Sequence, residues 1–130
     1  MRSLLPLLLA ACAFAAPTAP KKKPEPIKPL TPAQKSDYTK VVQPMFDAQC
    51  VSCHGPKKEK GKLRLDTLAN TLKASENGKS VIPGKSADSS LVKAVARLVE
   101  DDAMPPEGKG KPLTAEQIGL IRAWIDQGAK

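Results

Sequence analysis

Apolar residues recur at intervals of three and four in several stretches of this chain, and that spacing is typical of helices. The first predicted helix covers residues 36–43, with Val41 and Val42 on one side. Pro44 then breaks or restarts it, because proline cannot donate a backbone hydrogen bond. Residues 45–49 lead from this point into the next part of the chain.

Two further helices are predicted in the middle of the chain. Asp66 is placed to cap a short helix over residues 67–74, which would bury Leu68 and Leu72. After a turn at residues 82–84, another helix should run to Val99. Its candidate caps are Ser86 and Asp88, and its apolar stripe consists of Leu91, Val95 and Leu98, widened by Val92 and Val99.

The last helix has the clearest ends. Thr114 and Gln117 match a capping box, and Gly128 suits the position just after the helix. Its apolar stripe consists of Ile118, Ile121 and Ile125. No region alternates with period two for long enough to form a sheet, so the predicted fold class is all-α.

The amino-terminal region predicts an export signal over residues 1–15. Arg2 supplies a positive charge, residues 4–11 are apolar, and residues 13–15 match an A-x-A cleavage site. Residues 9–12 also match a lipoprotein signal, in which Cys12 would be lipidated and become the mature terminus. A soluble exported form and a lipid-anchored form are therefore both open.

Residues 16–32 are rich in proline and lysine and predict an extended linker ahead of one domain over residues 33–130. The chain of 130 residues carries a formal charge of +8. Sixteen basic and twelve acidic side chains fall within residues 33–130, which leaves that domain near +4. Aromatic residues are scarce and no recognition module is visible, so nucleic-acid binding is not expected.

Cys50-Val51-Ser52-Cys53-His54 is the strongest chemical signal in the chain. A C-x-x-C-H run is the attachment signature of c-type haem, with two thioether bonds and a histidine beneath the iron. A zinc site would need a fourth ligand, and His54 is the only histidine. A thioredoxin-like redox pair would need an α/β domain, and a plain disulfide is the remaining alternative.

Met104 stands fifty positions after His54 in a Met-Pro-Pro sequence, where its thioether could occupy the other axial site of the iron. Met45 is the rival thioether, but it lies just before Cys50 and has little reach to the far face. The large apolar side chains are few, so a bound porphyrin would complete the core. Its expected packing partners are Leu63, Leu65, Leu91, Ile121 and Trp124.

The ordered set of motifs resembles the planctomycete-type single-haem cytochrome c domain, a relative of the class I cytochromes c. The matching segments lie at residues 42–44, 50–56, 63–66, 81–84, 104–106 and 113–129. Lys62 departs from the family pattern, which favours a second glycine beside Gly61. The resemblance implies a small helical domain wrapped around one covalently bound haem c. It also implies thioethers at Cys50 and Cys53 and iron ligation by His54 and Met104.

We therefore expect an exported, periplasmic electron carrier and not an enzyme. The alternatives are a haem-based ligand-binding sensor, a cytochrome subunit of a larger oxidoreductase, or a lipoprotein that docks to a complex. Basic residues cluster just after the haem motif, at Lys57, Lys58, Lys60, Lys62 and Arg64. They predict redox partners, a donor and an acceptor, with acidic docking surfaces, although a solvated loop explains the cluster equally well.

Overall fold

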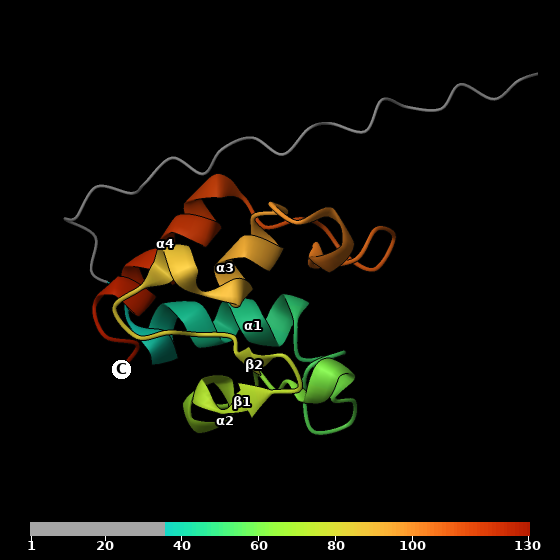
Figure 1. Ribbon diagram of the computed structural model, residues 1–130, viewed down its shortest axis with the longest axis horizontal. Coiled ribbons are helices and arrows are strands. Elements are labelled where there is room, and N and C mark those ends of the chain that lie inside the picture. Colours follow the sequence, from blue (N-terminus) through green and yellow to red (C-terminus); the bar gives the residue numbers. More distant parts are fainter. Residues whose placement is uncertain (1–35) are drawn as a thin grey trace, which may run out of the picture.

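The computed structural model describes residues 36–130, which form a domain with one central helix and further elements on both sides of it. Helices α3 (Ser90–Val95) and α4 (Ala115–Asp126) lie on one side of α1 (Gln43–Gln49) (Figure 1). The short α2 (Leu68–Leu72) and a small hairpin lie on the other side. The predicted export signal, Cys12 and the linker lie outside the described residues. Among residues 36–130, no helix is long and apolar enough to cross a membrane.

The first helical segment agrees with the prediction that Pro44 restarts the helix. A π-helical turn over Tyr38–Val42 leads directly into α1, and Pro44 lies in the first turn of α1. Proline fits there because the first backbone N–H groups of a helix have no partner within it. Asp37 caps the segment by accepting a hydrogen bond from the Lys40 backbone N–H at 2.9 Å.

The second helix is shorter than predicted and has a different cap. Thr67 caps α2 by accepting from the Asn70 backbone N–H at 3.1 Å. Asp66 is not available for that role, because its carboxylate binds Arg64 at 2.6 Å and the Asn70 side chain at 3.2 Å. Leu68 and Leu72 are only half-buried. These two leucines are therefore less buried than predicted.

A two-stranded hairpin follows α2 where the sequence predicted the end of a helix. Strand β1 (Ala74–Ser75) pairs antiparallel with β2 (Gly78–Lys79). Gly78 has a φ of 94°, which suits the turn between them. The small helical domain that was predicted is present, and this short ladder is the exception to it.

Helix α3 ends four residues earlier than predicted. Arg97 takes a left-handed φ of 58°, and its N–H donates to the Ala94 carbonyl at 3.0 Å. The Leu98 N–H donates to the Lys93 carbonyl at 3.0 Å, which completes a Schellman end. The chain then leaves the helix, so Leu98 is 47% exposed and Val99 is 43% exposed, whereas Leu91, Val92 and Val95 are buried as expected.

The predicted caps of α3 are also wrong. Ser86 and Asp88 belong to a separate 3-10 turn, Ser86–Asp88, and Ser89 precedes the helix instead. Asp126 of α4 holds this turn, because its carboxylate accepts from the Ser86 N–H and hydroxyl, both at 2.9 Å.

Helix α4 confirms its predicted ends and face. Thr114 and Gln117 form the capping box, with side-chain to backbone distances of 2.9 and 3.1 Å. Gly128 follows the helix with a φ of 104°, and its N–H donates to the Ile125 carbonyl. The three isoleucines of the stripe are buried.

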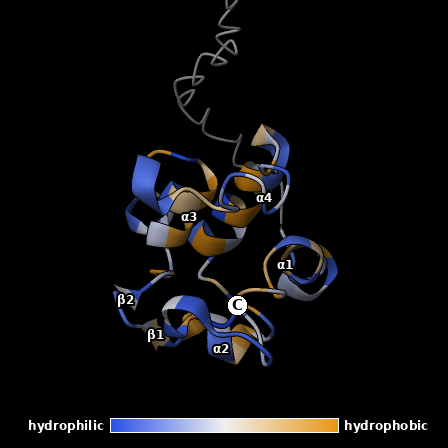
Figure 2. Cartoon of the chain, turned by 90° about the vertical axis from the view of Figure 1, so that its right-hand side faces the viewer, coloured by the Kyte–Doolittle hydropathy of each residue, from blue (hydrophilic) through white to orange (hydrophobic). Residues whose placement is uncertain are grey.

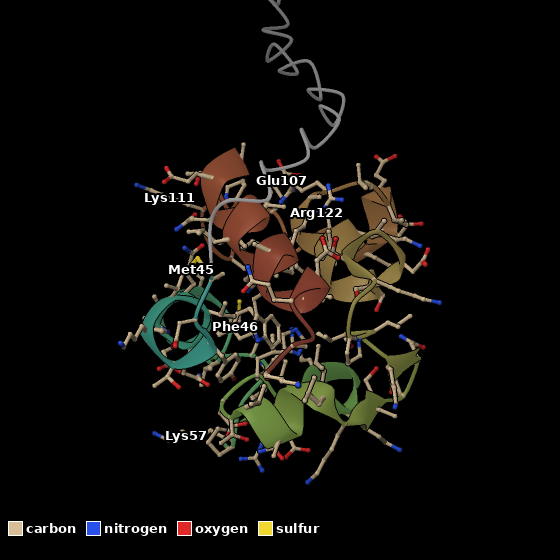
Figure 3. The ribbon with its side chains drawn as sticks, turned by 90° about the vertical axis from the view of Figure 1, so that its left-hand side faces the viewer. Met45, Phe46, Lys57, Glu107, Lys111 and Arg122 are labelled. Carbon is tan, nitrogen blue, oxygen red and sulfur yellow. The ribbon has the colours of Figure 1, made fainter. Side chains whose placement is uncertain are left out.

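Three aromatic rings join α4 to α1 and to the π-helical turn that precedes α1. Trp124 is 1% exposed, and its ring centroid lies 5.1 Å from that of Tyr38 and 6.4 Å from that of Phe46. Phe46 points from α1 toward the interior (Figure 3), and the apolar positions of α1, α3 and α4 face one another (Figure 2). Each aromatic pair adds about 0.5–1.5 kcal/mol beyond area burial. Ile121 and Trp124 are thus core residues of this helix contact.

A tight turn over Lys60–Lys62 contains two successive residues in the left-handed region. Gly61 has a φ of 65° and Lys62 a φ of 55°. Lysine has a Cβ atom that collides with the backbone in this conformation, at a cost of roughly 1–2 kcal/mol. This explains physically why a second glycine is favoured at this position.

We predict that Lys62→Gly stabilises the domain by up to about 1 kcal/mol, because relief of the backbone strain exceeds the extra entropy of the unfolded chain. Urea denaturation measures the change in the free energy of unfolding. Lys62→Ala is the matched control, since it removes the same charge but keeps the Cβ atom. An alanine variant as stable as the glycine variant would contradict the prediction.

Candidate functional site

The C-x-x-C-H segment forms a hydrogen-bonded turn directly after α1. The Cys50 N–H donates to the Phe46 carbonyl at 2.8 Å. The Cys50 carbonyl then accepts from the N–H groups of Cys53, at 3.1 Å, and His54, at 2.9 Å. Because residues three and four apart share one side of a helical turn, both cysteines and the histidine are presented together.

Gly55 lets the chain turn back immediately after His54. A Cβ atom at this position would lie 2.3 Å from the Val51 carbonyl oxygen and 2.7 Å from a Val51 methyl carbon. No other residue type fits without a shift of the backbone. The Gly55 N–H then donates to the Lys58 carbonyl at 2.8 Å, which closes the turn.

The orientation of the His54 ring is set by one hydrogen bond. Nδ1 lies 3.0 Å from the Lys60 backbone carbonyl oxygen. A carbonyl oxygen only accepts, so Nδ1 carries the proton and Nε2 is the nitrogen left with a lone pair for a metal. The Lys60 N–H donates to the Cys53 carbonyl at 3.0 Å, so the same turn holds both the ring and the cysteine backbone.

A cavity of about 540 Å³ opens beside this segment, and it is the principal feature of the site. Cys50, Cys53, His54 and Met104 all line it. A cavity of this size falls in the range that proteins use for organic cofactors. Its apolar lining includes Leu63, Leu65, Leu91, Val95 and Leu113. Leu63, Leu65 and Leu91 therefore occupy the predicted position, whereas Ile121 and Trp124 do not line the cavity.

Met104 reaches the cavity from a loop far along the chain. Its N–H donates to the Ala94 carbonyl at 3.0 Å, and its side chain is half-buried. The loop after α3 and the carboxyl end of α1 lie at the same end of the molecule (Figure 1). Met45 lies on α1 and packs against the core, not in the cavity (Figure 3). The expectation that Met45 has little reach thus agrees with the structure.

The chemistry of the lining fits a c-type haem. Cys50 and Cys53 are free thiols, which covalent attachment requires. Burial, with a smaller contribution from Cys53, raises the pKa of the Cys50 thiol to about 11, so this thiol is uncharged at neutral pH. Within residues 36–130, no group of three or more His, Cys, Asp and Glu side chains is arranged to hold a metal ion by itself.

Several polar residues line the cavity that sequence reasoning missed. The oxygen Oε1 of Gln49 is buried there without a hydrogen-bond partner. The hairpin of β1 and β2 contributes further polar residues to the lining. They were missed because no sequence signal predicted the hairpin. The missed polar residues are Gln49, Ser52, Ser75, Glu76, Asn77, Ser80, Asp102 and Lys109.

One of the five basic residues after the motif, Arg64, forms ion pairs with acidic neighbours. Arg64 pairs with Asp66 at 2.6 Å and with Glu59 at 3.5 Å. This hydrogen bonding raises the pKa of Arg64 and lowers that of Asp66. The four lysines of the cluster are exposed, and Lys57 points outward at the surface away from α4 (Figure 3). We call Lys57, Lys58, Lys60 and Lys62 the lysine cluster; Lys60 also lines the cavity.

Comparison with known proteins gives one clear result. Residues 50–108 match the family described as Planctomycete cytochrome C. No curated protein and no solved structure matches the chain. The matched segment begins at the first cysteine of the motif and includes Met104. The match supports a planctomycete-type cytochrome c domain over residues 50–108 of the chain.

Proposed function

We propose that this protein is a single-haem electron carrier that passes one electron at a time between redox partners outside the cytoplasm. One observation carries the proposal. Cys50, Cys53, His54 and Met104 line a single cavity, although fifty residues separate His54 from Met104. The family match supports haem as the cofactor. When bound, haem supplies an iron that alternates between the ferric and ferrous states.

The residues around the cavity have separate roles in this proposal. Cys50 and Cys53 attach the porphyrin, and His54 offers Nε2 to the iron while the Lys60 carbonyl holds its ring. Met104 would offer a soft thioether to the iron, which would favour the ferrous state and raise the reduction potential. The leucines of the lining would keep water away from the bound group.

The lining also argues for electron transfer and against bond-making chemistry. His54 is the only histidine of the chain, and the proposed ligation uses it. No second imidazole is therefore present to serve as the acid–base group that haem peroxidases require. A sixth ligand from Met104 would close the iron to small molecules. A ligand-binding sensor needs that site open, and the first experiment below separates the two functions.

We further propose that the carrier works in the periplasm, either free or anchored through a lipid on Cys12. Its electron donor and acceptor would present acidic surfaces to the lysine cluster. Support comes from the exposure of Lys57 and Lys58 and from Lys60, which connects the cluster to the cavity. Opposite charges would steer the partners to the part of the surface nearest the haem.

We predict that Met104→Ala opens the iron to carbon monoxide. The reduced wild-type spectrum should not change under the gas, whereas the variant should bind one molecule per haem and have a lower reduction potential. Optical titration and potentiometry measure both effects. Met45→Ala is the matched control and should behave as wild type. Carbon monoxide binding by the wild-type protein would instead support the sensor function.

We predict that the domain does not fold stably without haem. A largely apolar cavity of about 540 Å³, at roughly 24 cal/mol per Å³ for a closed void, would cost about 13 kcal/mol as an upper bound. That cost is comparable to the whole stability of a small domain. Circular dichroism of Cys50→Ala/Cys53→Ala should show reduced helicity and no cooperative transition. Native helicity with a sharp thermal transition would contradict this.

We predict that the lysine cluster speeds electron transfer with anionic reagents. Lys57→Glu/Lys58→Glu should slow oxidation of the ferrous protein by ferricyanide about two- to threefold at low salt, and high salt should abolish the difference. Lys85→Glu/Lys93→Glu changes the net charge equally at other exposed positions. Stopped-flow rates that are equal for the two double variants would show that the cluster has no steering role.

A further inference from the structure

The segment that carries Met104 is held by hydrogen bonds more than by apolar packing. No residue of the described range 97–112 is buried. Two bonds connect the Met104-Pro105 pair to the end of α3. The Met104 N–H donates to the Ala94 carbonyl at 3.0 Å, and Nη1 of Arg97 donates to the Pro105 carbonyl at 3.0 Å.

Arg97 makes its bond from a strained position. It is the residue just after the end of α3, and its φ of 58° lies in the left-handed region. Glycine is favoured at such helix ends because it adopts this conformation without a steric cost. The backbone bonds that close α3 need only the N–H groups of residues 97 and 98, which glycine would also supply. Only the bond from the guanidinium to the Pro105 carbonyl requires an arginine here.

We propose that Arg97 is a positioning residue that sets how firmly Met104 holds the sixth site of the iron. This inference rests on the proposed function, in which Met104 is the axial ligand. Arg97 does not line the cavity in which the haem would bind. It acts through Pro105, the neighbour of Met104, by fixing the loop against the last turn of α3.

The two hydrogen bonds to α3 restrain different parts of the Met104-Pro105 backbone. The Ala94 carbonyl accepts from the Met104 N–H and so restrains the backbone just before the methionine side chain. Arg97 fixes the carbonyl that follows, so the backbone on both sides of the thioether is restrained. A hydrogen bond from a charged donor in a half-buried site changes an equilibrium by roughly tenfold or more. Without it, the loop should open roughly tenfold more often.

Four variants of the haem-loaded protein test this proposal. Arg97→Gln removes the reach and the charge of the donor, Arg97→Gly removes the donor and the backbone strain, and Arg97→Lys keeps the charge. Arg122→Gln is the matched control, because Arg122 is also a half-buried arginine, and it donates to Ser86 on the α4 side of the molecule (Figure 3). Met104→Ala serves as the reference for a fully open site.

Two measurements are made on each variant. Hydrogen exchange of the Met104 amide reports loop opening without reference to the iron, and the rate of carbon monoxide binding to the ferrous protein reports release of the thioether. Arg97→Gln and Arg97→Gly should increase both rates roughly tenfold. Arg97→Lys should restore part of the wild-type behaviour, and Arg122→Gln should match wild type. Arg97→Gly should also keep or raise the thermal midpoint, which a merely structural role for Arg97 would not produce.

The outcomes separate this inference from the proposed function. If Met104→Ala binds carbon monoxide while Arg97→Gln matches wild type in both rates, the positioning role is wrong and Met104 stays the ligand. If Met104→Ala leaves carbon monoxide binding unchanged, Met104 is not the ligand, and the role of Arg97 at the iron is wrong with it. A fall in the thermal midpoint of Arg97→Gly, with Met104 amide exchange unchanged, would also overturn the proposal.

Discussion

The contact of α4 with the helical segment over residues 38–49 is the interaction on which the rest of the structure depends. Phe46 and Tyr38 meet Trp124 with ring centroids 5.1–6.4 Å apart, and all three side chains are buried. The contact fixes the axis of α1, and the cysteine and histidine motif forms the hydrogen-bonded turn that directly follows this helix. A shift of α1 would therefore move Cys50, Cys53 and His54 together. Stable helix packing places the first half of the site, before any cofactor is considered.

The aromatic core and the cavity divide the apolar residues of the domain between them. Leu65 is buried and also lines the cavity, as does Leu91, so the two regions share a wall. The core proper is small, because the chain has few aromatic residues. A porphyrin in the cavity would add a large apolar surface between α3 and the loops that follow α1 in the chain. The cofactor is in this sense part of the core as well as the proposed redox centre.

The two sides of the cavity are built in physically different ways. The histidine side is mostly local: the hydrogen bonds of Cys50, Cys53, His54 and Gly55 all join residues within the short range 46–65, and Gly55 allows the sharp reversal. The methionine side is assembled at a distance. It depends on where α3 ends and on the two bonds that bring the Met104-Pro105 pair back to that end. A local turn is stiff, whereas an exposed loop held by two bonds opens more readily. Control of the iron is therefore expected on the methionine side.

The sequence by itself determined the features that interactions between neighbouring residues control. The helical class, the capping box at Thr114 and the stripe of α4 followed from spacing and side-chain chemistry, because neighbouring residues decide them. The same is true of the cysteine and histidine motif. The sequence marked Lys62 only as a departure from the family pattern, and the structure adds that its backbone is left-handed.

Tertiary structure alone decided the features that involve competition or distance. Asp66 was a sound cap by sequence, but Arg64 and Asn70 take its carboxylate. Leu98 continued an apolar stripe by spacing, but Arg97 ends the helix first, so that its side chain meets Pro105. Trp124 was a reasonable haem contact until packing placed it against Tyr38. The partners of Asp66 lie within four residues of it, whereas Arg97 meets Pro105 eight residues away and Trp124 meets a ring from the other end of the domain. In each case the spacing of residues along the chain does not say which partner a side chain takes.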